Sequence, residues 1–442
     1  MSPATPDPAW QISTLADGAR QLAERGEKTE AERIYRTILK TAPYHVGALM
    51  FLAARAMEHG KLDESQQLLE QALRADRRRP MVYQNLGLVY KARGDLQQAL
   101  AAINQALALQ PDSYPFLLHK GSILQDLELQ EQALACYQHA LRCLPAAPKA
   151  MIDNLALHEN IRTLIRGALE FVRRSQIVLV NKYVDPVTAH YGKQALERVH
   201  SAAKIHLQIT EPHYQHFLQR PAYLYIPDVT PQAFFERDEF DWISSFEGAT
   251  SQIRTELETI LANNNNLTPY VKIDENMDPQ QWRGLNGSSQ WSAYHLLKGG
   301  TIVRDHGTYC PHTLDAISRL PLPKIAGHAP EAFFSILRPG THIPPHHGVG
   351  NYKLAAHLPL IVPDNCVIRV GHESRSWTEG QCLIFDDSFQ HEAWNHSTSL
   401  RAVLIVEIWN PLLSKAEQEG VAALIAAITE LNQGNMNGHG AT

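Results

Sequence analysis

A repeat with a period of 34 residues fills the first third of the chain and constrains its fold more than any other feature. Shifting the sequence by that period brings small and apolar residues into register over about 145 residues. Glycines return at one point of each unit, where a tight or left-handed turn between two helices favours them. The pattern predicts four helix-turn-helix units, with Glu128 in place of the glycine in the fourth. The residues in register include Ala31, Ser65, Ala99 and Ala133, then Leu39, Leu73, Leu107 and Leu141, and the turn glycines Gly26, Gly60 and Gly94.

This pattern resembles the tetratricopeptide repeat, whose unit is a pair of helices, and we assign it to residues 10–145. Pro43, Pro111 and Pro145 follow the second helix of their units, where a helix must end. Stacked repeats of this kind form a superhelix whose concave face commonly holds an extended peptide or a partner helix. The resemblance therefore implies a peptide or protein partner. The alternative is a repeat that serves only as a dimerisation or spacer element.

Length and charge limit what the whole chain does. Its 442 residues exceed one ordinary hydrophobic core, so at least two domains are expected. A net charge of -6 at pH 7, without a basic stripe, argues against binding to nucleic acid or to an anionic membrane. The first residues lack the pattern of a signal peptide and no segment is apolar enough to span a bilayer, so we expect a cytoplasmic protein. Five cysteines without CxxC spacing support neither a disulfide framework nor a zinc ribbon.

The character of the sequence changes after the repeat. Residues 146–218 keep apolar residues at helical spacing, which predicts a helical cap and linker. From residue 219 to about 415, proline and aromatic residues increase and short apolar runs alternate with turn residues, which predicts a double-stranded β-helix, or jelly-roll barrel. Residues 416–442 are expected to form a helix and a flexible tail. The chain is thus predicted to be multidomain and α + β. The predicted strands lie in APEAFFSILRPG, YKLAAHLPLIVP, CVIRVGHE, QCLIFDD and LRAVLIVEIWNP.

Three polar residues of the predicted barrel have the spacing of a metal and anion site. His346 ends one strand, His391 follows 45 residues later, and Arg401 lies ten residues beyond His391. Arg401 opens an apolar strand, where a buried cation needs an anionic partner. Two neutral imidazoles suit iron(II), and a guanidinium binds a carboxylate through paired hydrogen bonds. The neighbours His342 and His347 are expected to be structural or rim residues, because successive side chains of a strand alternate between its faces.

The spacing resembles that of the non-haem iron(II), 2-oxoglutarate-dependent oxygenases, which bind iron through two histidines and one carboxylate. Gly348 stands where that carboxylate is expected. With the motifs SILRPGTHIPPHHG, HLPLIVP, LIFDDSFQHEAWN and RAVLIVEIWNP, this glycine makes residues 219–415 similar to the aspartyl/asparaginyl beta-hydroxylases. That branch is known for a two-histidine iron site with glycine in place of the carboxylate. The resemblance implies a jelly-roll oxygenase that uses Fe(II), 2-oxoglutarate and O2.

The same resemblance implies roles for individual residues. His346 and His391 would bind the iron and, together with Arg401, form the catalytic set. Ser335 and Arg401 would bind the distal carboxylate of 2-oxoglutarate. His357 would contact the carboxylate next to the metal.

A second group of residues would surround the metal and the substrate. Asp387 would lie behind the ligands and would restrain the turn that presents His391 or a metal-bound water, while Gly348 marks the vacated ligand position. Family members that modify proteins hold the substrate carboxylate with basic residues, and Phe333 and Ala355 stand in those places here. Lys353 is close by and is the candidate to replace one of them. We therefore take these three residues as the candidate substrate pocket, without assuming an acidic target.

The sequence favours a dioxygenase that hydroxylates an unactivated carbon. Our interpretation is the β-carbon of an amino-acid residue in a peptide or protein recruited by the repeat. Two alternatives remain open. One is a 2-oxoglutarate-dependent halogenase, in which a halide takes the place of the missing carboxylate. The other is a non-catalytic interaction protein with a degenerate barrel.

Overall fold

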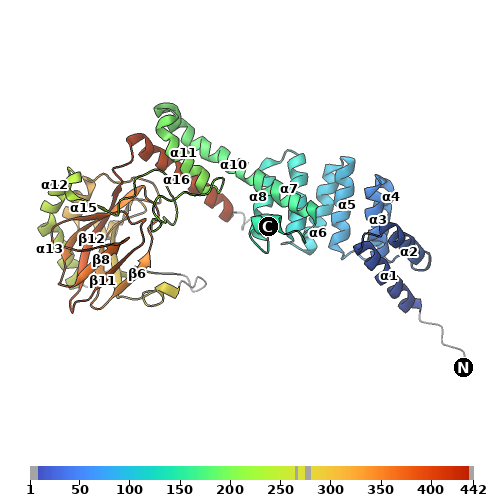
Figure 1. The fold of residues 1–442 in the computed structure, drawn as a ribbon, viewed down its shortest axis with the longest axis horizontal. Coiled ribbons are helices and arrows are strands. Elements are labelled where there is room, and N and C mark those ends of the chain that lie inside the picture. The colour runs from blue at the N-terminus through green and yellow to red at the C-terminus, as the bar shows by residue number, and fades with distance from the viewer. Residues whose placement is uncertain (1–7, 264–266, 274–279, 438–442) are drawn as a thin grey trace, which may run out of the picture. The chain divides into compact units, whose positions relative to one another are not determined.

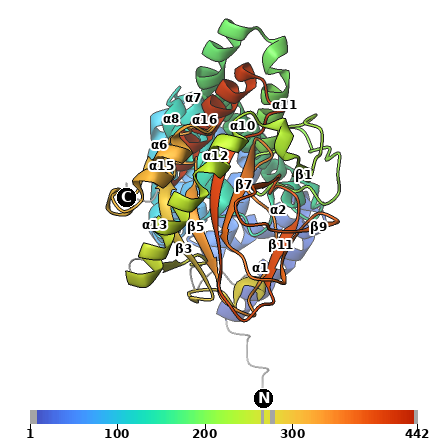
Figure 2. The same cartoon turned by 90° about the vertical axis from the view of Figure 1, so that its left-hand side faces the viewer.

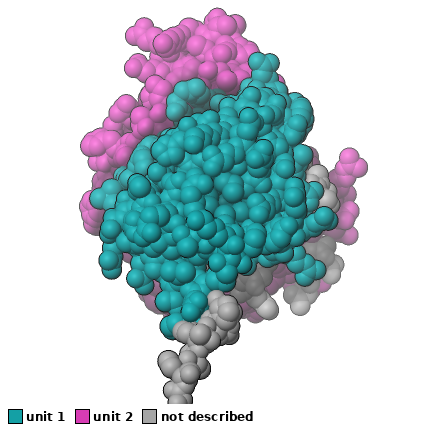
Figure 3. All heavy atoms as spheres, turned by 90° about the vertical axis from the view of Figure 1, so that its right-hand side faces the viewer, with its two compact units in different colours: residues 1–175, 434–442 teal, residues 176–433 magenta. Residues whose placement is uncertain are grey.

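The computed structural model describes residues 8–263, 267–273 and 280–437 (Figure 1). The chain divides into two compact units, residues 1–175 with 434–442 and residues 176–433 (Figure 3). The division falls within helix α10 (Glu159–Tyr191), inside the segment that we expected to be a cap and linker. No helix of the described ranges is long and apolar enough to cross a membrane.

Between residues 8 and 142 the structure describes eight helices that pack as four consecutive pairs, which confirms the predicted repeat (Figure 1). Gly26, Gly60 and Gly94 end the first helix of their pairs with φ of 84°, 71° and 85°. Glu128 takes the same left-handed conformation, with φ of 61°, although it carries a Cβ. The helices are α1 (Pro8–Glu24), α2 (Lys28–Thr41), α3 (Val46–Glu58), α4 (Leu62–Ala75), α5 (Pro80–Arg93), α6 (Leu96–Leu109), α7 (Tyr114–Asp126) and α8 (Gln130–Arg142).

The aligned small residues explain why the helices of each pair pack closely. Ala31, Ser65, Ala99 and Ala133 are all buried. At Gly121 a Cβ would collide with the ring of Tyr137 from the partner helix. Helix α9 (Pro148–Asp153) and the first half of α10 close the unit with an apolar cluster, so the repeat does not end on an exposed core.

The second unit begins with helices. The second half of α10, η1 (Gln194–Leu196), α11 (Glu197–His206) and the C-terminal helix α16 (Lys415–Asn437) share one apolar cluster. Val184, Val199 and Leu424 are among its buried members. Residues 415–433 of the C-terminal helix are therefore part of this unit. Residues 438–442 of the predicted tail lie outside the described residues.

Two antiparallel sheets follow, which confirms the predicted α + β architecture. In the large sheet the strand order is β1-β10-β7-β12-β5-β3-β2, with β4 beside β3, and in the small sheet it is β6-β11-β8-β9. The large sheet contains β1 (Phe234–Phe235), β2 (Thr268–Pro269), β3 (Trp291–Lys298), β4 (Thr301–Ile302), β5 (Ala332–Leu337), β7 (Lys353–Ile361), β10 (Leu383–Phe385) and β12 (Arg401–Trp409). The small sheet contains β6 (His342–His346), β8 (Cys366–Val370), β9 (Glu373–Ser376) and β11 (His391–Asn395).

Helices cover one face of the large sheet, and the small sheet packs on the other (Figure 2). Leu337 and Phe385 of the large sheet share an apolar cluster with Ile343 and Ile368 of the small sheet. Because side chains alternate along each strand, every second residue of β5, β7 and β12 points into this space. The covering helices are α12 (Ile243–Gly248), α13 (Thr250–Asn263) and α15 (Pro311–Ser318), and short helices η2 (Arg237–Glu239), η3 (Gln280–Trp282) and α14 (Arg304–Gly307) lie in the connections.

Candidate functional site

Two histidines lie next to each other where strands β6 and β11 of the small sheet pair. His346 is the last residue of β6 and His391 the first of β11, and the two are paired across the small sheet. Their ring centroids are 4.0 Å apart. Each Nδ1 lies 2.9 Å from the backbone carbonyl oxygen two residues earlier, of Pro344 and of Phe389. Nδ1–H therefore donates to the carbonyl, and Nε2 keeps the lone pair that a metal ion needs.

Both imidazoles are neutral at physiological pH. Burial and, to a smaller extent, the neighbouring His391 lower the pKa of His346 to about 3. Burial also lowers the pKa of His391 to about 4. Neutral imidazole is the form that binds metal ions, so the site is ready to bind without releasing protons.

Asp387 occupies the place of the missing side chain at Gly348. The backbone N–H of Gly348 donates to the carbonyl oxygen of Asp387 at 2.6 Å, and a Cβ on residue 348 would overlap the carboxyl group of Asp387. The Oδ1 atom of that carboxylate is buried and has no hydrogen-bond partner among the described residues. The structure thus places Asp387 next to Gly348, and the carboxyl group of Asp387 occupies the volume that a side chain at residue 348 would need.

Arg401 is a buried cation without a counter-ion. Its side chain is 1% exposed, and within the described ranges no carboxylate lies at ion-pair distance from it. One terminal nitrogen lies 3.4 Å from the Oγ and from the carbonyl oxygen of Ser335, while Nε has no hydrogen-bond partner in the part of the chain that the structure describes. The guanidinium stacks on the ring of Trp377 at 4.8 Å. Burial lowers the pKa of Arg401 to about 10, which still leaves it charged at neutral pH.

His357 connects the arginine and the histidine pair. It is buried on β7, and burial followed by the charges of Arg401 and His391 holds its pKa well below the usual value. The indole N–H of Trp377 donates to its Nδ1 at 3.3 Å. Because a neutral imidazole carries one proton, that proton lies on Nε2, which can donate to an anion. Ser335 is fixed in a similar way, by the indole N–H of Trp291 at 3.0 Å.

The comparisons with known proteins match both parts of the chain. Residues 247–411 match the family described as aspartyl/asparaginyl beta-hydroxylase, and residues 80–113 match the tetratricopeptide repeat. The two-sheet domain thus contains the segment that matches the aspartyl/asparaginyl beta-hydroxylase family. This hydroxylase domain follows tetratricopeptide repeats in the chain, as the sequence motifs predicted.

Several curated proteins resemble the hydroxylase domain. The ornithine lipid ester-linked acyl 2-hydroxylase of Rhizobium tropici is 34% identical over 197 residues, which cover 44% of this chain and 66% of that protein. The aspartate beta-hydroxylase domain-containing protein 2 of Xenopus tropicalis is 29% identical over 214 residues, 47% of this chain and 55% of that protein. The aspartyl/asparaginyl beta-hydroxylase of Homo sapiens is 34% identical over 142 residues, 32% of this chain and 18% of that protein. The chain therefore spans less than two thirds of the length of each of these relatives.

An aromatic wall lines the hydroxylase domain beside the histidine pair. The ring of Tyr270 stacks on Trp291 at 4.1 Å and on Phe333 at 5.2 Å. Trp282 contacts the ring of His346 at 5.2 Å. Phe333 is 5% exposed, and Ala355 lies on the neighbouring part of the same inner surface, 6% exposed. The two uncharged residues predicted for the substrate pocket are thus part of an apolar surface.

Lys353 is not free at this surface. Its Nζ contacts Glu407 and lies 3.7 Å from Oδ2 of Asp387. Burial opposes its positive charge, but the charges of Asp387 and Glu407 outweigh burial and raise the pKa of Lys353 above its usual value. Sequence reasoning missed Glu407, which stands at an inward position of β12, two residues after Ile405. The alternation of inward and outward side chains along β12 could have indicated that Glu407 points inward.

The predicted bystanders make structural contacts. His342 lies 2.8 Å from Glu392 and stacks on Trp394 at 4.9 Å, away from the histidine pair. Sequence reasoning also missed Tyr270, which directly follows β2, and Trp291, the first residue of β3, because neither strand was predicted. Their aromatic character alone did not distinguish them from ordinary core residues.

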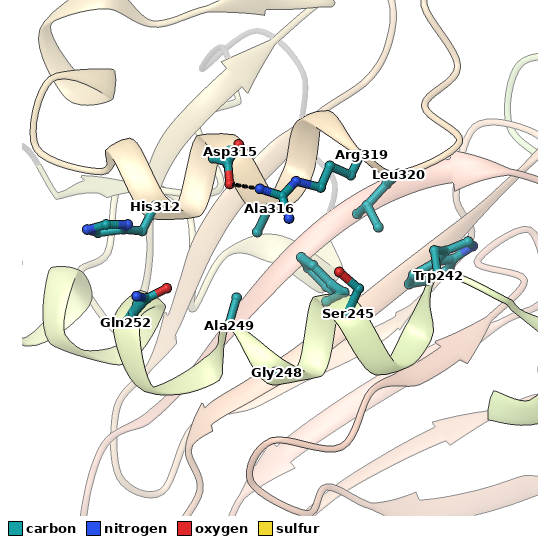
Figure 4. Close-up of a pocket in the computed structure, with 11 residues that line it drawn as sticks. Trp242, Ser245, Gly248, Ala249, Gln252, His312, Asp315, Ala316, Arg319 and Leu320 are labelled. Atoms are coloured by element: carbon teal, nitrogen blue, oxygen red, sulfur yellow. Dashed lines mark hydrogen bonds and ion pairs between the residues drawn. The ribbon is translucent and has the colours of Figure 1, made fainter.

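Two further features lie outside this site. In the repeat unit, Asp112, His139 and Cys143 offer ligand atoms within 4.8 Å of one another, but Asp112 is exposed. A cavity of about 230 Å³ lies between the α12–α13 segment and α15, where Trp242 and His312 line its wall (Figure 4). It contains none of the predicted site residues.

Proposed function

We propose that the hydroxylase domain is an Fe(II)- and 2-oxoglutarate-dependent dioxygenase that hydroxylates an unactivated carbon. The observation that carries this proposal is the buried guanidinium of Arg401, which has no carboxylate partner among the described residues and lies in the same interior as a pair of neutral histidines. A buried cation without a counter-ion is unfavourable unless a ligand supplies the negative charge. A dicarboxylate that also reaches a metal ion meets both requirements.

The residues fit an iron ion. His346 and His391 would hold it through Nε2, because both Nδ1 atoms already donate to backbone carbonyls. Asp387 would balance part of its charge from the space beside Gly348, where its Oδ1 has no partner among the described residues. When bound, iron, 2-oxoglutarate and O2 would supply the oxidising chemistry, and the protein would supply orientation and exclusion of water.

The residues also fit 2-oxoglutarate. Arg401 and Ser335 would bind its distal carboxylate, with the indoles of Trp377 and Trp291 fixing the surroundings. The Nε2–H of His357 would donate to the carboxylate nearer the metal. The indole N–H groups of Trp377 and Trp291 therefore orient His357 and Ser335, which would bind the cosubstrate.

The proposed substrate is an amino-acid residue, hydroxylated at its β-carbon, in a peptide or protein held by the concave face of the repeat. The tetratricopeptide match and the relative named aspartyl/asparaginyl beta-hydroxylase support it. A second candidate is the acyl chain of a lipid. The apolar surface around Phe333 and Ala355 favours it, as does the relative named ornithine lipid ester-linked acyl 2-hydroxylase.

The first experiment measures the visible charge-transfer band of the protein with Fe(II) and 2-oxoglutarate in the absence of oxygen. The wild type should develop the band and His391→Ala should lose it. His342→Ala is the matched control, because that histidine is hydrogen-bonded to Glu392 instead, and it should keep the band. A wild type without the band would point to the non-catalytic alternative.

The second experiment identifies the substrate class by the consumption of 2-oxoglutarate under oxygen. Peptides that bind the repeat should increase consumption and gain the mass of one oxygen atom. Acylated lipids that do so instead would favour the second candidate. Chlorinated product in the presence of chloride would establish the halogenase alternative.

A further inference from the structure

We propose that Lys353 is a positioning residue: anchored by Glu407, it holds the carboxylate of Asp387 in the space left by Gly348. This inference rests on the metal site of the proposed function. It gives Lys353 a task different from the substrate binding that its place in the sequence suggested.

Lys353 is buried between two carboxylates. It stands at the start of β7, opposite Trp409, and its side chain reaches Glu407 on the neighbouring strand β12. Only 3% of the residue is exposed. On its other side, Nζ lies 3.7 Å from Oδ2 of Asp387. A buried ammonium group needs such partners, because leaving it unpaired is far more costly than leaving it in water.

Glu407 is itself fixed in place. One carboxylate oxygen contacts Lys353, and the other accepts the backbone N–H of Glu331 at 2.9 Å. The ammonium of Lys353 therefore has an immobile anchor. An acidic substrate would have to compete with this carboxylate and with Asp387 for the same cation, so Lys353 is a poor receptor for a substrate carboxylate.

Asp387 receives a defined orientation from these contacts. Its backbone oxygen accepts the N–H of Gly348 at 2.6 Å, and its carboxyl group fills the volume of the absent side chain. Lys353 lies beside Oδ2, whereas Oδ1 is buried and without a partner among the described residues. One oxygen is thus held by the lysine, and the other remains available to the metal site. Groups that orient the surroundings of a metal commonly change its affinity about 10- to 100-fold.

The test is a double-mutant cycle on metal affinity. The protein is titrated with Co(II) by calorimetry and, in parallel, with Fe(II) and 2-oxoglutarate by the anaerobic charge-transfer band. Lys353→Met and Asp387→Asn should each weaken metal binding by at least about tenfold. The double variant should bind no more weakly than Asp387→Asn alone, because the lysine acts through the aspartate. Lys353→Arg should restore part of the affinity.

Controls separate positioning from folding and from substrate binding. Lys298→Met, at the exposed end of β3, should leave metal affinity unchanged. If Lys353→Met does not fold, Glu407→Gln replaces it, since loss of the anchor should weaken binding in the same direction. Independent, additive losses in the cycle would overturn the proposal. So would unchanged metal affinity in Lys353→Met combined with a raised KM for substrate.

Failure of the lysine's positioning role and failure of the proposed reaction give different results. The Co(II) titration needs only the two histidines and Asp387, so it tests the lysine even if no 2-oxoglutarate band forms. A missing band in the wild type would remove the proposed reaction and leave the positioning of Asp387 to be decided by the cobalt cycle.

Discussion

Replacing Arg401 by methionine should stabilise the protein that has no ligand bound. Burial lowers the pKa of this guanidinium from an ordinary 12.5 to about 10. Each tenfold change in acidity corresponds to about 1.4 kcal/mol, so burial of the charge costs about 3 kcal/mol at pH 7. Because the folded state disfavours the charged guanidinium, the cost in folding free energy is present below pH 10 and disappears only above pH 12.5.

Methionine removes this cost but also loses the stacking of the guanidinium on Trp377, which contributes about 1 kcal/mol. The net expectation is a free energy of unfolding about 2 kcal/mol higher than that of the wild type. Urea unfolding followed by tryptophan fluorescence measures it, because six of the seven tryptophans lie within residues 176–433. Arg338→Met, on the exposed turn after β5, is the control and should change stability by less than about 0.5 kcal/mol.

Arg401→Met should also lose most of the increase in unfolding free energy that ligand binding gives the wild type. Co(II) with 2-oxoglutarate, at about 100 times its dissociation constant, stabilises a competent site by about 2.7 kcal/mol. The wild type should gain this amount, and Arg401→Met should gain much less. A variant without ligand that is less stable than the wild type by more than about 1 kcal/mol would refute the reasoning. Arg401 would then be a satisfied structural residue and not a cation awaiting an anion.

Three other expectations concern single positions. Gly348→Asp should abolish Co(II) binding in calorimetry because the new side chain collides with Asp387, and Asp387→Gly in the same chain should restore it; failure of that rescue would contradict the shared volume. Glu128→Gly should raise the thermal stability of the repeat unit, by about 1 kcal/mol, since glycine adopts φ of 61° without strain. Burial and the charge of Lys91 lower the pKa of His119 to about 4, so the folded state loses stability as pH falls from 6.5 towards 4. Between pH 7 and pH 5, the free energy of unfolding of His119→Gln, measured with urea, should therefore fall by about 2 kcal/mol less than that of the wild type. An equal fall in both proteins would contradict this assignment.

The repeat and the strand ends could be predicted from the sequence because their signals are local. The 34-residue period carries its small residues and turn glycines in fixed places, and each of these positions is now seen at a helix contact or a helix turn. His346 and Arg401 were placed at the end and the start of strands, where the structure has them. Proline and glycine residues beside apolar runs define such ends without knowledge of the fold.

The surroundings of the site could not be predicted because they depend on contacts between distant segments. Asp387 meets Gly348 only because the turn before β11 lies against the end of β6, and the sequence does not record that approach. Tyr270 directly follows β2 and stacks on Phe333 of β5, a contact between segments that lie far apart in the chain. The ion pair of Lys353 could not be predicted either, because its partner Glu407 lies 54 positions away on another strand. Without that partner, Lys353 looks like a free cation that could bind substrate.

Charge balance links the cosubstrate to the substrate. Among the described residues of this interior, the cations Arg401 and Lys353 are matched by the anions Asp387 and Glu407, and burial raises the pKa of the adjacent Asp386 to about 7, which favours the neutral form of that carboxyl group. The two cations and two anions cancel, and a divalent metal with a 2-oxoglutarate dianion adds no net charge. In a poorly hydrated interior an additional uncompensated ion is strongly disfavoured. A bound halide would add one negative charge, as would an acidic side chain placed beside Phe333. The arrangement therefore favours hydroxylation over halogenation, and an uncharged group on the carbon to be oxidised.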